Sequence, residues 1–245
     1  MRGFVVALQF LTRLPTPALP DFQPQWIARA VPFFPVIGWL VGALAGAVFW
    51  GISLVLPGWP AAIAALAAGL LVTGGFHEDG LADTADGLGG GLTPERRLAI
   101  MKDSRLGSYG ALALWAVLSF KAALLARVAP VEGALALVLA GGAARALVTP
   151  VMAGMAYARD PAEAKLKPAP EGVRSWEAAL ALVIGLAPLL LLRPVAGGAG
   201  AALAALVVLW LARTARRLIG GWTGDVLGGC EALAEAALLA GLAAG

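Results

Sequence analysis

Residues 74–110 read GGFHEDGLADTADGLGGGLTPERRLAIMKDSRLGSYG, and this stretch concentrates charge in an otherwise apolar chain. The chain is 60% hydrophobic and only 13% charged, yet this segment holds six of its 15 acidic residues and four of its 18 basic ones. Charged side chains are costly in an apolar environment unless they are solvated or used in function. We therefore expect the segment to form the active site, supported by the rest of the chain.

The composition outside this segment is that of a membrane protein. The mean hydropathy is +0.84, and the chain contains eight Trp and long apolar runs separated by Gly and Pro. This composition predicts an all-α, polytopic membrane protein whose residues 1–245 form a single integral membrane domain. The net charge of +3 requires no nucleic-acid partner, because Lys and Arg accumulate beside membrane spans for topological reasons. The sole cysteine, Cys230, excludes an intramolecular disulfide and a cysteine-based zinc site.

Seven apolar runs are long enough to be predicted as membrane spans. The fifth and sixth runs are short, and Pro188 interrupts the fifth. Residues 2–14 have helical amphipathic spacing, which fits either a helix on the membrane surface or the start of a buried helix. The predicted spans are 31–56, 61–76, 111–129, 133–156, 177–192, 199–212 and 226–244.

Basic residues predict the orientation of these spans. Fourteen of the 18 basic residues fall in segments on one side of the predicted bilayer. The positive-inside rule places that side, with the N-terminus and residues 74–110, in the cytoplasm, and the C-terminus outside. These residues are Arg2, Arg13, Arg29, Arg96, Arg97, Lys102, Arg105, Arg159, Lys165, Lys167, Arg174, Arg213, Arg216 and Arg217.

Three other basic residues fall inside predicted spans. Lys121 and Arg127 are expected either to extend to the interface or to pair with an acidic neighbour. Arg145 lies near the middle of its span, where an unpaired guanidinium is expensive. A structural ion pair and an anion-binding site are two equal interpretations of Arg145.

The acidic half of the central segment has the spacing of a helix face. Asp79, Asp83 and Asp86 stand at i, i+4 and i+7, so a helix places them on one narrow face. Their mutual repulsion requires basic partners, raised pKa values or a bound cation. Oxygen ligands favour Mg²⁺ or Mn²⁺, and Mg²⁺ uses few protein carboxylates together with waters and substrate phosphates. Glu78, about a quarter-turn away, either ligates from the side or faces solvent.

A solvated polar loop is the alternative, in which the acidic residues pair with Arg96, Arg97 and Lys102. The spacing argues against it, because Gly80 and Gly87 directly follow two of the aspartates. Missing side chains at these positions would let a ligand or a neighbouring helix approach closely.

The second half of the segment has the residues of a phosphate site. Thr93 and Pro94 predict the N-cap and first residue of a short helix that runs to about Ser104. The sequence Lys-Asp-Ser-Arg at 102–105 then offers cations for phosphate oxygens and a possible metal ligand, Asp103. A basic cluster that touches anionic lipid is the alternative, but it does not account for Asp103.

Two further residues are candidates for the same site. His77, the only histidine, is either a satisfied interfacial side chain or a general base or phosphate contact. Asp225, in the polar sequence GGWTGD at 220–225, lies on the same predicted face and either completes the metal site or caps the last span.

These motifs together resemble a known family, the cobalamin 5′-phosphate synthases, also called adenosylcobinamide-GDP ribazoletransferases. The resemblance lies in GGFHEDGLADT with DG at 74–87, in IMKDSRLG with Gly110, and in GWTGD at 221–225. It extends to the early sequences RLP at 13–15 and FPVIG at 34–38, so it covers most of the chain. Glu78 departs from the pattern, because an apolar residue is expected there in many relatives.

The resemblance implies a Mg²⁺-dependent transferase of the bacterial inner membrane. Such an enzyme joins adenosylcobinamide-GDP to α-ribazole, or to its 5′-phosphate, and releases GMP in the final assembly step of cobalamin biosynthesis. We expect the metal ligands among Glu78, Asp79, Asp83, Asp86 and Asp225. The expected catalytic residues are His77, Asp83 and Asp103, and the expected substrate-binding residues are Lys102, Ser104, Arg105, Gly107, Arg145 and Thr223.

Two other functions fit parts of the pattern. A membrane phosphotransferase of the CDP-alcohol type also uses clustered aspartates with Mg²⁺, but its D-x-x-D-G-x-x-A-R opening fails here at Phe76 and Asp83. A cation-coupled transporter would also use intramembrane charges. Residues 125–245 contain no second copy of the aspartate pattern, which argues against paired transporter halves.

Overall fold

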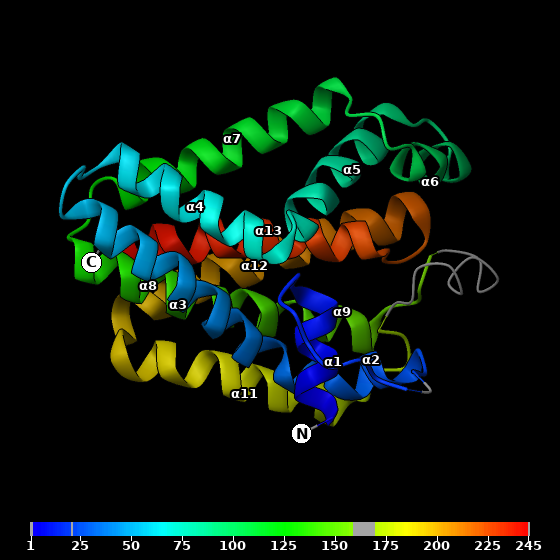
Figure 1. The fold of residues 1–245 in the computed structure, drawn as a ribbon. Helices are drawn as coiled ribbons and strands as arrows, with labels where there is room; N and C mark the ends of the chain where they lie inside the picture. The colour runs from blue at the N-terminus through cyan, green and yellow to red at the C-terminus, as the bar shows by residue number, and fades with distance from the viewer. Residues whose placement is uncertain (1, 21, 159–169, 245) are drawn as a thin grey trace.

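The structure is a computed structural model that describes residues 2–20, 22–158 and 170–244. Within these residues the chain is helical (Figure 1), so the all-α prediction is confirmed. One isolated β-bridge joins Tyr157 and Trp222. The basic residues Arg159, Lys165 and Lys167 lie outside the described residues. The helices are α1 (Arg2–Leu11), α2 (Gln25–Ala30), η1 (Val31–Phe33), α3 (Phe34–Ser53), α4 (Trp59–Thr73), α5 (Phe76–Gly90), α6 (Pro94–Lys102), α7 (Ser108–Leu125), α8 (Pro130–Leu147), α9 (Thr149–Gly154), α11 (Ser175–Leu192), α12 (Pro194–Ile219) and α13 (Gly224–Ala243).

Six helical stretches in the described residues are long and apolar enough to cross a membrane. They correspond to six of the seven predicted spans, and they confirm the polytopic membrane class. The second predicted span differs, because α4 turns by 91° into α5 and the two helices form one broken span or a re-entrant loop. Figure 1 shows α4 beside α3 and α5 leaving the end of α4 partway along the bundle.

Two glycines produce this bend. Gly74 and Gly75 have φ values of +73° and +69°, the left-handed region that other residues adopt only at a cost. Gly74 caps α4, and the Arg13 side chain packs where a Cβ at Gly74 would stand. The backbone N–H of Arg13 also donates to the carbonyl of Val72 at 2.8 Å. The bend therefore starts the charged helix α5 inside the bundle.

Small residues bring α3 and α8 into close contact. Gly38, Gly42 and Gly46 recur every four residues on α3, and a Cβ at any of them would collide with the backbone of α8. Helices in membranes associate through such small-residue faces, because lipid provides no hydrophobic force that drives them together. This packing fixes the position of Arg145 near the C-terminal end of α8.

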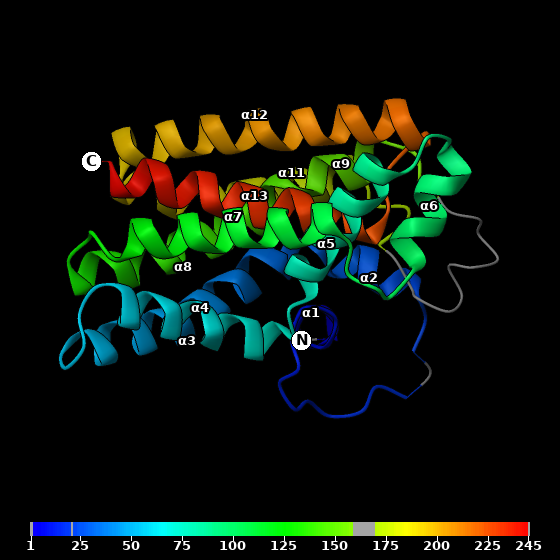
Figure 2. The same ribbon diagram turned by 90° about the horizontal axis from the view of Figure 1, so that it is seen from above.

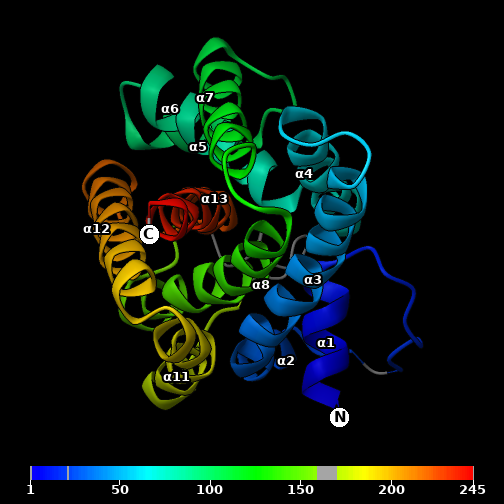
Figure 3. The same cartoon turned by 90° about the vertical axis from the view of Figure 1, so that its left-hand side faces the viewer.

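The last helix, α13, lies at the centre of the bundle. It contacts α5, α7, α8 and α12, and Figure 3 shows these helices around it. About two thirds of the residues in the apolar stretch of α13 are buried, compared with 22% of those in α7. Polar side chains on α13 therefore face other helices rather than lipid.

Several predicted boundaries were wrong. The helix α12 runs from Pro194 to Ile219, longer than the predicted span, because it continues through its basic end. Pro188 does not interrupt α11, and Arg127 lies in the turn after α7 rather than inside a span. The segment α1 forms a separate amphipathic helix that packs against α2 and α3 (Figure 2).

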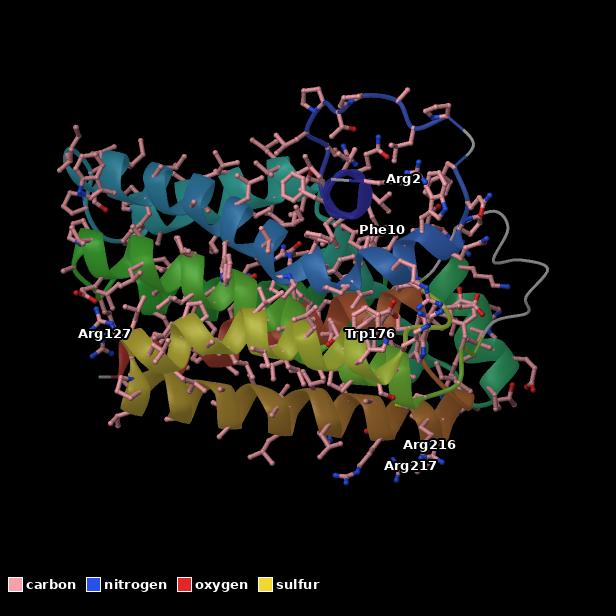
Figure 4. The ribbon with its side chains drawn as sticks, turned by 90° about the horizontal axis from the view of Figure 1, so that it is seen from below. Arg2, Phe10, Arg127, Trp176, Arg216 and Arg217 are labelled. Atoms are coloured by element: carbon pink, nitrogen blue, oxygen red, sulfur yellow. The ribbon has the colours of Figure 1, made fainter. Side chains whose placement is uncertain are left out.

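The charged ends of the bundle follow the predicted pattern. Figure 4 shows Arg2, Arg216 and Arg217 at one end of the molecule and Arg127 at the other. The helix α6 lies at the first of these ends (Figure 1). The cytoplasmic orientation of that end stays a prediction.

Candidate active site

A cavity of about 480 Å³ lies where α5 and α13 meet α1, α3 and α8. Two of the predicted metal ligands, Asp79 from α5 and Asp225 from α13, line it, although they are far apart in the sequence. His77, Arg145 and Glu231 also line its wall. These five side chains come from three helices, α5, α8 and α13, which the bend after α4 and the central position of α13 bring together.

Glycines allow α5 and α13 to approach closely enough to form this cavity. A Cβ on Gly80 would lie 2.8 Å from the carbonyl oxygen of Asp225, and a Cβ on Gly228 would lie 3.2 Å from the Cα of Gly80. The first distance is shorter than Cβ contacts in real structures, and the second is tighter than most of them. The expectation that Gly80 permits a close approach is confirmed, and the neighbour is a helix.

The segment 220–225 positions Asp225 in the cavity. Gly220 ends α12 with a φ of +83°, and Gly221 packs directly against the carbonyl of Ala156. The buried Trp222 donates its backbone N–H to Ala156 at 3.0 Å and its indole N–H to the carbonyl of Met155 at 3.1 Å. These bonds fix the start of α13 against the chain after α9.

Thr223 is the N-cap of α13 and also a hydrogen-bond partner of Asp225. Its hydroxyl accepts the backbone N–H of Val226 at 3.2 Å and donates to Asp225 Oδ2 at 3.3 Å. Thr223 is fully buried. It therefore orients Asp225 in this structure, and its predicted role in substrate binding stays a prediction.

Arg145 and His77 share one acidic partner, Glu231 of α13. Arg145 Nη1 lies 2.8 Å from Glu231 Oε1, and His77 Nδ1 lies 3.4 Å from Glu231 Oε2. All three side chains are buried, and Arg145 also donates to the carbonyl of Gly141 at 2.9 Å. The Nε of Arg145 has no hydrogen-bond partner in the described structure. Arg145 thus forms an ion pair and also lines the cavity. Its position fits both predicted roles, a structural ion pair and an anion-binding site.

Sequence reasoning missed Glu231 and its neighbour Glu235. Both interrupt the apolar helix α13, and they stand one helical turn apart. An acidic residue within a membrane span signals a functional or paired group, and this signal was present in the sequence.

Glu235 belongs to a second charged cluster, deeper in the bundle. Lys121 of α7 is buried, with its Nζ 3.3 Å from Glu235 Oε1 and 3.9 Å from Glu78 Oε1. These groups border a small cavity of about 40 Å³ between α3, α4, α5, α7, α8 and α13. Lys121 therefore pairs inside the bundle instead of extending to the interface. Glu78 faces this cluster, while Asp79, the next residue, lines the larger cavity.

Asp86 has a structural partner that the sequence analysis did not identify. Its two carboxylate oxygens accept the backbone N–H groups of Gly107 at 2.8 Å and Gly110 at 2.9 Å, at the start of α7. A carboxylate at a helix N-terminus satisfies unpaired N–H groups and is favoured by the helix dipole. A Cβ at either glycine would collide with this carboxylate. Gly107 therefore serves the Asp86 cap, although it was predicted to bind substrate.

Asp83 stands between these two aspartates on α5. It is half-buried and lies one turn beyond Asp79. Its predicted roles in metal binding and catalysis stay predictions.

The predicted phosphate site lies outside the lining of the cavity. Thr93 caps α6 by accepting the backbone N–H of Arg96 at 3.3 Å, which confirms the predicted helix start. The helix ends at Lys102, and the exposed Arg105 binds Asp103 through both carboxylate oxygens, with Nη2 2.5 Å from Oδ2. This hydrogen-bonded guanidinium lowers the pKa of Asp103 to about 2.

The following Ser104 is exposed. The residues 102–105 thus form a solvated cluster at the charged end of the bundle, and their phosphate-binding role stays a prediction.

The described residues fit a Mg²⁺ ion that takes two protein carboxylates and completes its coordination with water and substrate. No three His, Cys, Asp or Glu side chains in the described parts of the chain form a group that could hold a metal ion. Magnesium, however, commonly uses one or two carboxylates and completes its octahedron with water and substrate phosphates. Asp79 and Asp225, from facing helices in one cavity, match this need. Three carboxylates and one guanidinium line the cavity, so a cation would also offset an excess of negative charge.

A family model and several curated relatives point to the same family. The family model for cobalamin-5-phosphate synthase matches residues 3–243. A relative from Shewanella amazonensis, named adenosylcobinamide-GDP ribazoletransferase, is 43% identical over 95% of this chain and 91% of its own. Relatives of the same name from Leptothrix cholodnii and Ralstonia pickettii are also 43% identical, over 100% and 97% of this chain and 96% and 93% of theirs.

No solved structure matches the chain. The matched range of the family model includes the motifs at 74–87, 100–110 and 221–225 that carry the resemblance. The chain therefore belongs to the cobalamin-5-phosphate synthase family.

Proposed function

We propose that this chain is a Mg²⁺-dependent transferase that joins adenosylcobinamide-GDP to α-ribazole, or to its 5′-phosphate, and releases GMP. The names of its relatives supply the reaction class and the substrates. The observation that carries the proposal is the cavity that Asp79 and Asp225 line together with Arg145 and His77. We further propose an inner-membrane location with the N-terminus and the cavity on the cytoplasmic side and the C-terminus outside.

The reaction exchanges one phosphorus–oxygen bond for another. A ribazole hydroxyl oxygen forms a bond to the phosphorus attached to cobinamide, and the bond from that phosphorus to the GMP oxygen breaks. The hydroxyl proton leaves to a base, and GMP carries away the bonding electron pair. A bound Mg²⁺ would neutralise charge that develops on the phosphate oxygens.

The chain's own residues divide this work. Asp79 and Asp225 hold the cation, and Thr223 orients Asp225 through its 3.3 Å hydrogen bond. Glu78 and Asp86 are left out of this set, because Glu78 faces Lys121 and Asp86 caps α7. Asp83, one helical turn beyond Asp79 on α5, keeps its proposed roles in metal binding and catalysis.

Three buried residues, Arg145, His77 and Glu231, stabilise the developing charge and accept the proton. Arg145 presents positive charge in the cavity wall, where phosphate oxygens are stabilised most effectively in the absence of water. His77 accepts the proton from the ribazole hydroxyl, and the contact of its Nδ1 with Glu231 directs the other ring nitrogen away from α13. Glu231 is a positioning residue in this scheme.

The solvated cluster at 102–105 takes the remaining predicted role. Lys102 and Arg105 lie at the same end of the bundle as the basic segments, where they can contact diphosphate oxygens that the cavity wall leaves exposed. Arg105 must then exchange Asp103 for a phosphate, a carboxylate-to-phosphate exchange that a bidentate guanidinium accommodates.

A reconstituted assay tests the proposal. Purified protein in detergent is incubated with adenosylcobinamide-GDP, α-ribazole and Mg²⁺, and GMP release and the corrinoid product are measured. We expect GMP in proportion to the joined product, loss of turnover with a chelator, and recovery on addition of Mg²⁺.

A matched pair of variants makes the assay specific. Asp225→Asn should lose turnover, whereas Glu132→Gln, at the opposite end of the bundle beside Arg193, should retain it. Absence of GMP from folded wild-type protein with competent substrates would refute the proposed function.

A further inference from the structure

One wall of the cavity is aromatic and has no role in the reaction scheme above. Phe10 of α1 and Phe76, the first residue of α5, line it, and their rings meet edge to face with centroids 5.5 Å apart. Phe34 of α3 stacks against Phe10 with centroids 5.7 Å apart and planes 19° apart. We call these three residues the aromatic wall.

The rings of the aromatic wall differ in exposure. Phe34 is only 1% exposed and serves as a support behind Phe10. Phe10 is half-buried, and Phe76 is 41% exposed, so these two rings offer surface to a ligand. Figure 4 labels Phe10 on α1. The short helix α1 therefore contributes a ring to the cavity, a role that the sequence analysis did not predict.

The chemistry of this wall suits a flat ligand of low polarity. Aromatic faces bind planar rings by stacking or edge-to-face contact. The two polar side chains next to these rings in sequence have partners. The amide of Gln9 donates to the carbonyl of Pro17 at 2.9 Å, and His77 Nδ1 lies 3.4 Å from Glu231 Oε2. A base with several hydrogen-bonding edges would leave them unpaired against this wall, at a cost.

The size of the cavity limits which substrate enters it. A volume of about 480 Å³ lies within the range of cavities that enclose drug-sized ligands. A nucleoside is of this size, whereas a corrin macrocycle with its side chains and attached nucleotide is much larger. The macrocycle therefore stays outside the cavity, and adenosylcobinamide-GDP presents its phosphates to the side of the cavity formed by Asp79, Asp225 and Arg145.

We propose that the aromatic wall binds the planar base of the ribazole substrate and thereby selects for a bicyclic base of low polarity. This inference rests on the proposed function. The base lies against Phe10 and Phe76, and the attached ribose then reaches the side of the cavity that holds His77. Guanine, the other base in the reaction, is the competing occupant, and its polar edges do not match the wall.

The test measures the KM of each substrate separately. Phe10→Leu and Phe76→Leu remove a ring but keep an apolar side chain. Each should raise the KM for α-ribazole about fivefold to tenfold and leave the KM for adenosylcobinamide-GDP within twofold. Preference for α-ribazole over the same riboside with a polar purine base should fall by a similar factor.

Phe4→Leu is the matched control. Phe4 is a half-buried ring on the same helix, and it packs edge to face on Phe33, with centroids 6.4 Å apart, outside the cavity lining. It should leave both KM values unchanged. Melting temperatures of all three variants show whether α1 stays docked.

Three results would overturn the inference in a protein that makes GMP. A rise in the KM for adenosylcobinamide-GDP alone would assign the wall to guanine. Equal changes in Phe10→Leu and Phe4→Leu would make the rings purely structural. Unchanged KM values in both cavity variants would exclude a contact with either base. Absence of GMP from the wild-type protein would instead count against the proposed function.

Discussion

Asp79 and Asp86 occupy equivalent angular positions on α5 but have different partners. Asp79 is exposed and lines the large cavity, as does Asp225 of α13. Asp86 is buried, and both of its oxygens are bonded to the start of α7. Their spacing predicted that both bind one metal ion, while in the structure one lines the cavity and the other caps a helix.

The difference teaches that angular alignment on a helix is not proximity. Residues at i and i+7 share a face, but the rise along the axis separates them by about 10 Å. A single Mg²⁺ ion with ligands at about 2 Å cannot bridge two such carboxylates. A partner from another helix, here Asp225, supplies the second ligand more readily than the next turn of the same helix.

The largest expected effect comes from the cavity side of this comparison. Asp79→Asn should lower kcat about 1,000-fold, because it removes a carboxylate for the cation that offsets charge on the phosphate. The melting temperature should stay within about 2 °C of the wild type, since Asp79 is exposed in the free protein. Steady-state kinetics at saturating substrates and a thermal melt measure the two quantities. A large loss of stability with normal kcat would reverse the assigned roles.

Glu78 is next to Asp79 in sequence, but it faces Lys121 inside the bundle instead of the large cavity. Lys121→Met should lower the free energy of unfolding by about 3 kcal/mol, because Glu78 and Glu235 would remain buried without their cation. Adding Glu235→Gln should restore part of that loss. Unfolding in denaturant, compared among wild type, single and double variants, measures the coupling. Equal stability of all three proteins would contradict the internal ion pair.

Asp86→Ala should act on stability with a smaller magnitude. We expect a loss of about 2 kcal/mol, because two buried N–H groups at the start of α7 lose their charged acceptor. The kcat per folded molecule should remain within threefold of the wild type. Chevron or equilibrium unfolding gives the first value, and activity normalised to folded protein gives the second. A loss of kcat as large as that of Asp79→Asn would return Asp86 to the metal site.

The smallest effect is expected at the solvated cluster. The pKa of Asp103 is lowered from 3.8 to about 2 by Arg105, so the ionised form is the one that folding favours. Its contribution to stability is therefore present above about pH 4 and is lost as the pH falls towards 2. Both groups are solvated, so Asp103→Asn should change the melting temperature only slightly at pH 6 and not at all near pH 2. Melting curves across this range provide the measurement, and a difference that grows at low pH would contradict it.

Much of the fold followed from local sequence. Apolar runs predicted the helices, and Thr93 with Pro94 predicted the start of α6, because these signals act within one or two helical turns. The bend at Gly74 and Gly75 was not predicted, since a glycine pair permits a left-handed turn without requiring one. The length of α12 was underestimated because its basic residues were taken as the end of the helix.

The sequence by itself determined the class of protein, the family resemblance and the inventory of charged groups. Composition dictates the solvent in which each helix is stable, and motifs retain residue types in order along the chain. It also placed Asp79 and Asp225 among the candidates, because both stand in polar segments beside apolar runs.

Only the tertiary structure decided which of these groups meet. Arg145 contacts Glu231 across 86 positions of sequence, and Phe10 reaches the same cavity from the first helix. Such pairings depend on where helices cross and how deeply each one lies, and glycines such as Gly80 and Gly228 set those crossings. Periodicity fixes a direction around one helix axis, but contact requires the position of a second axis.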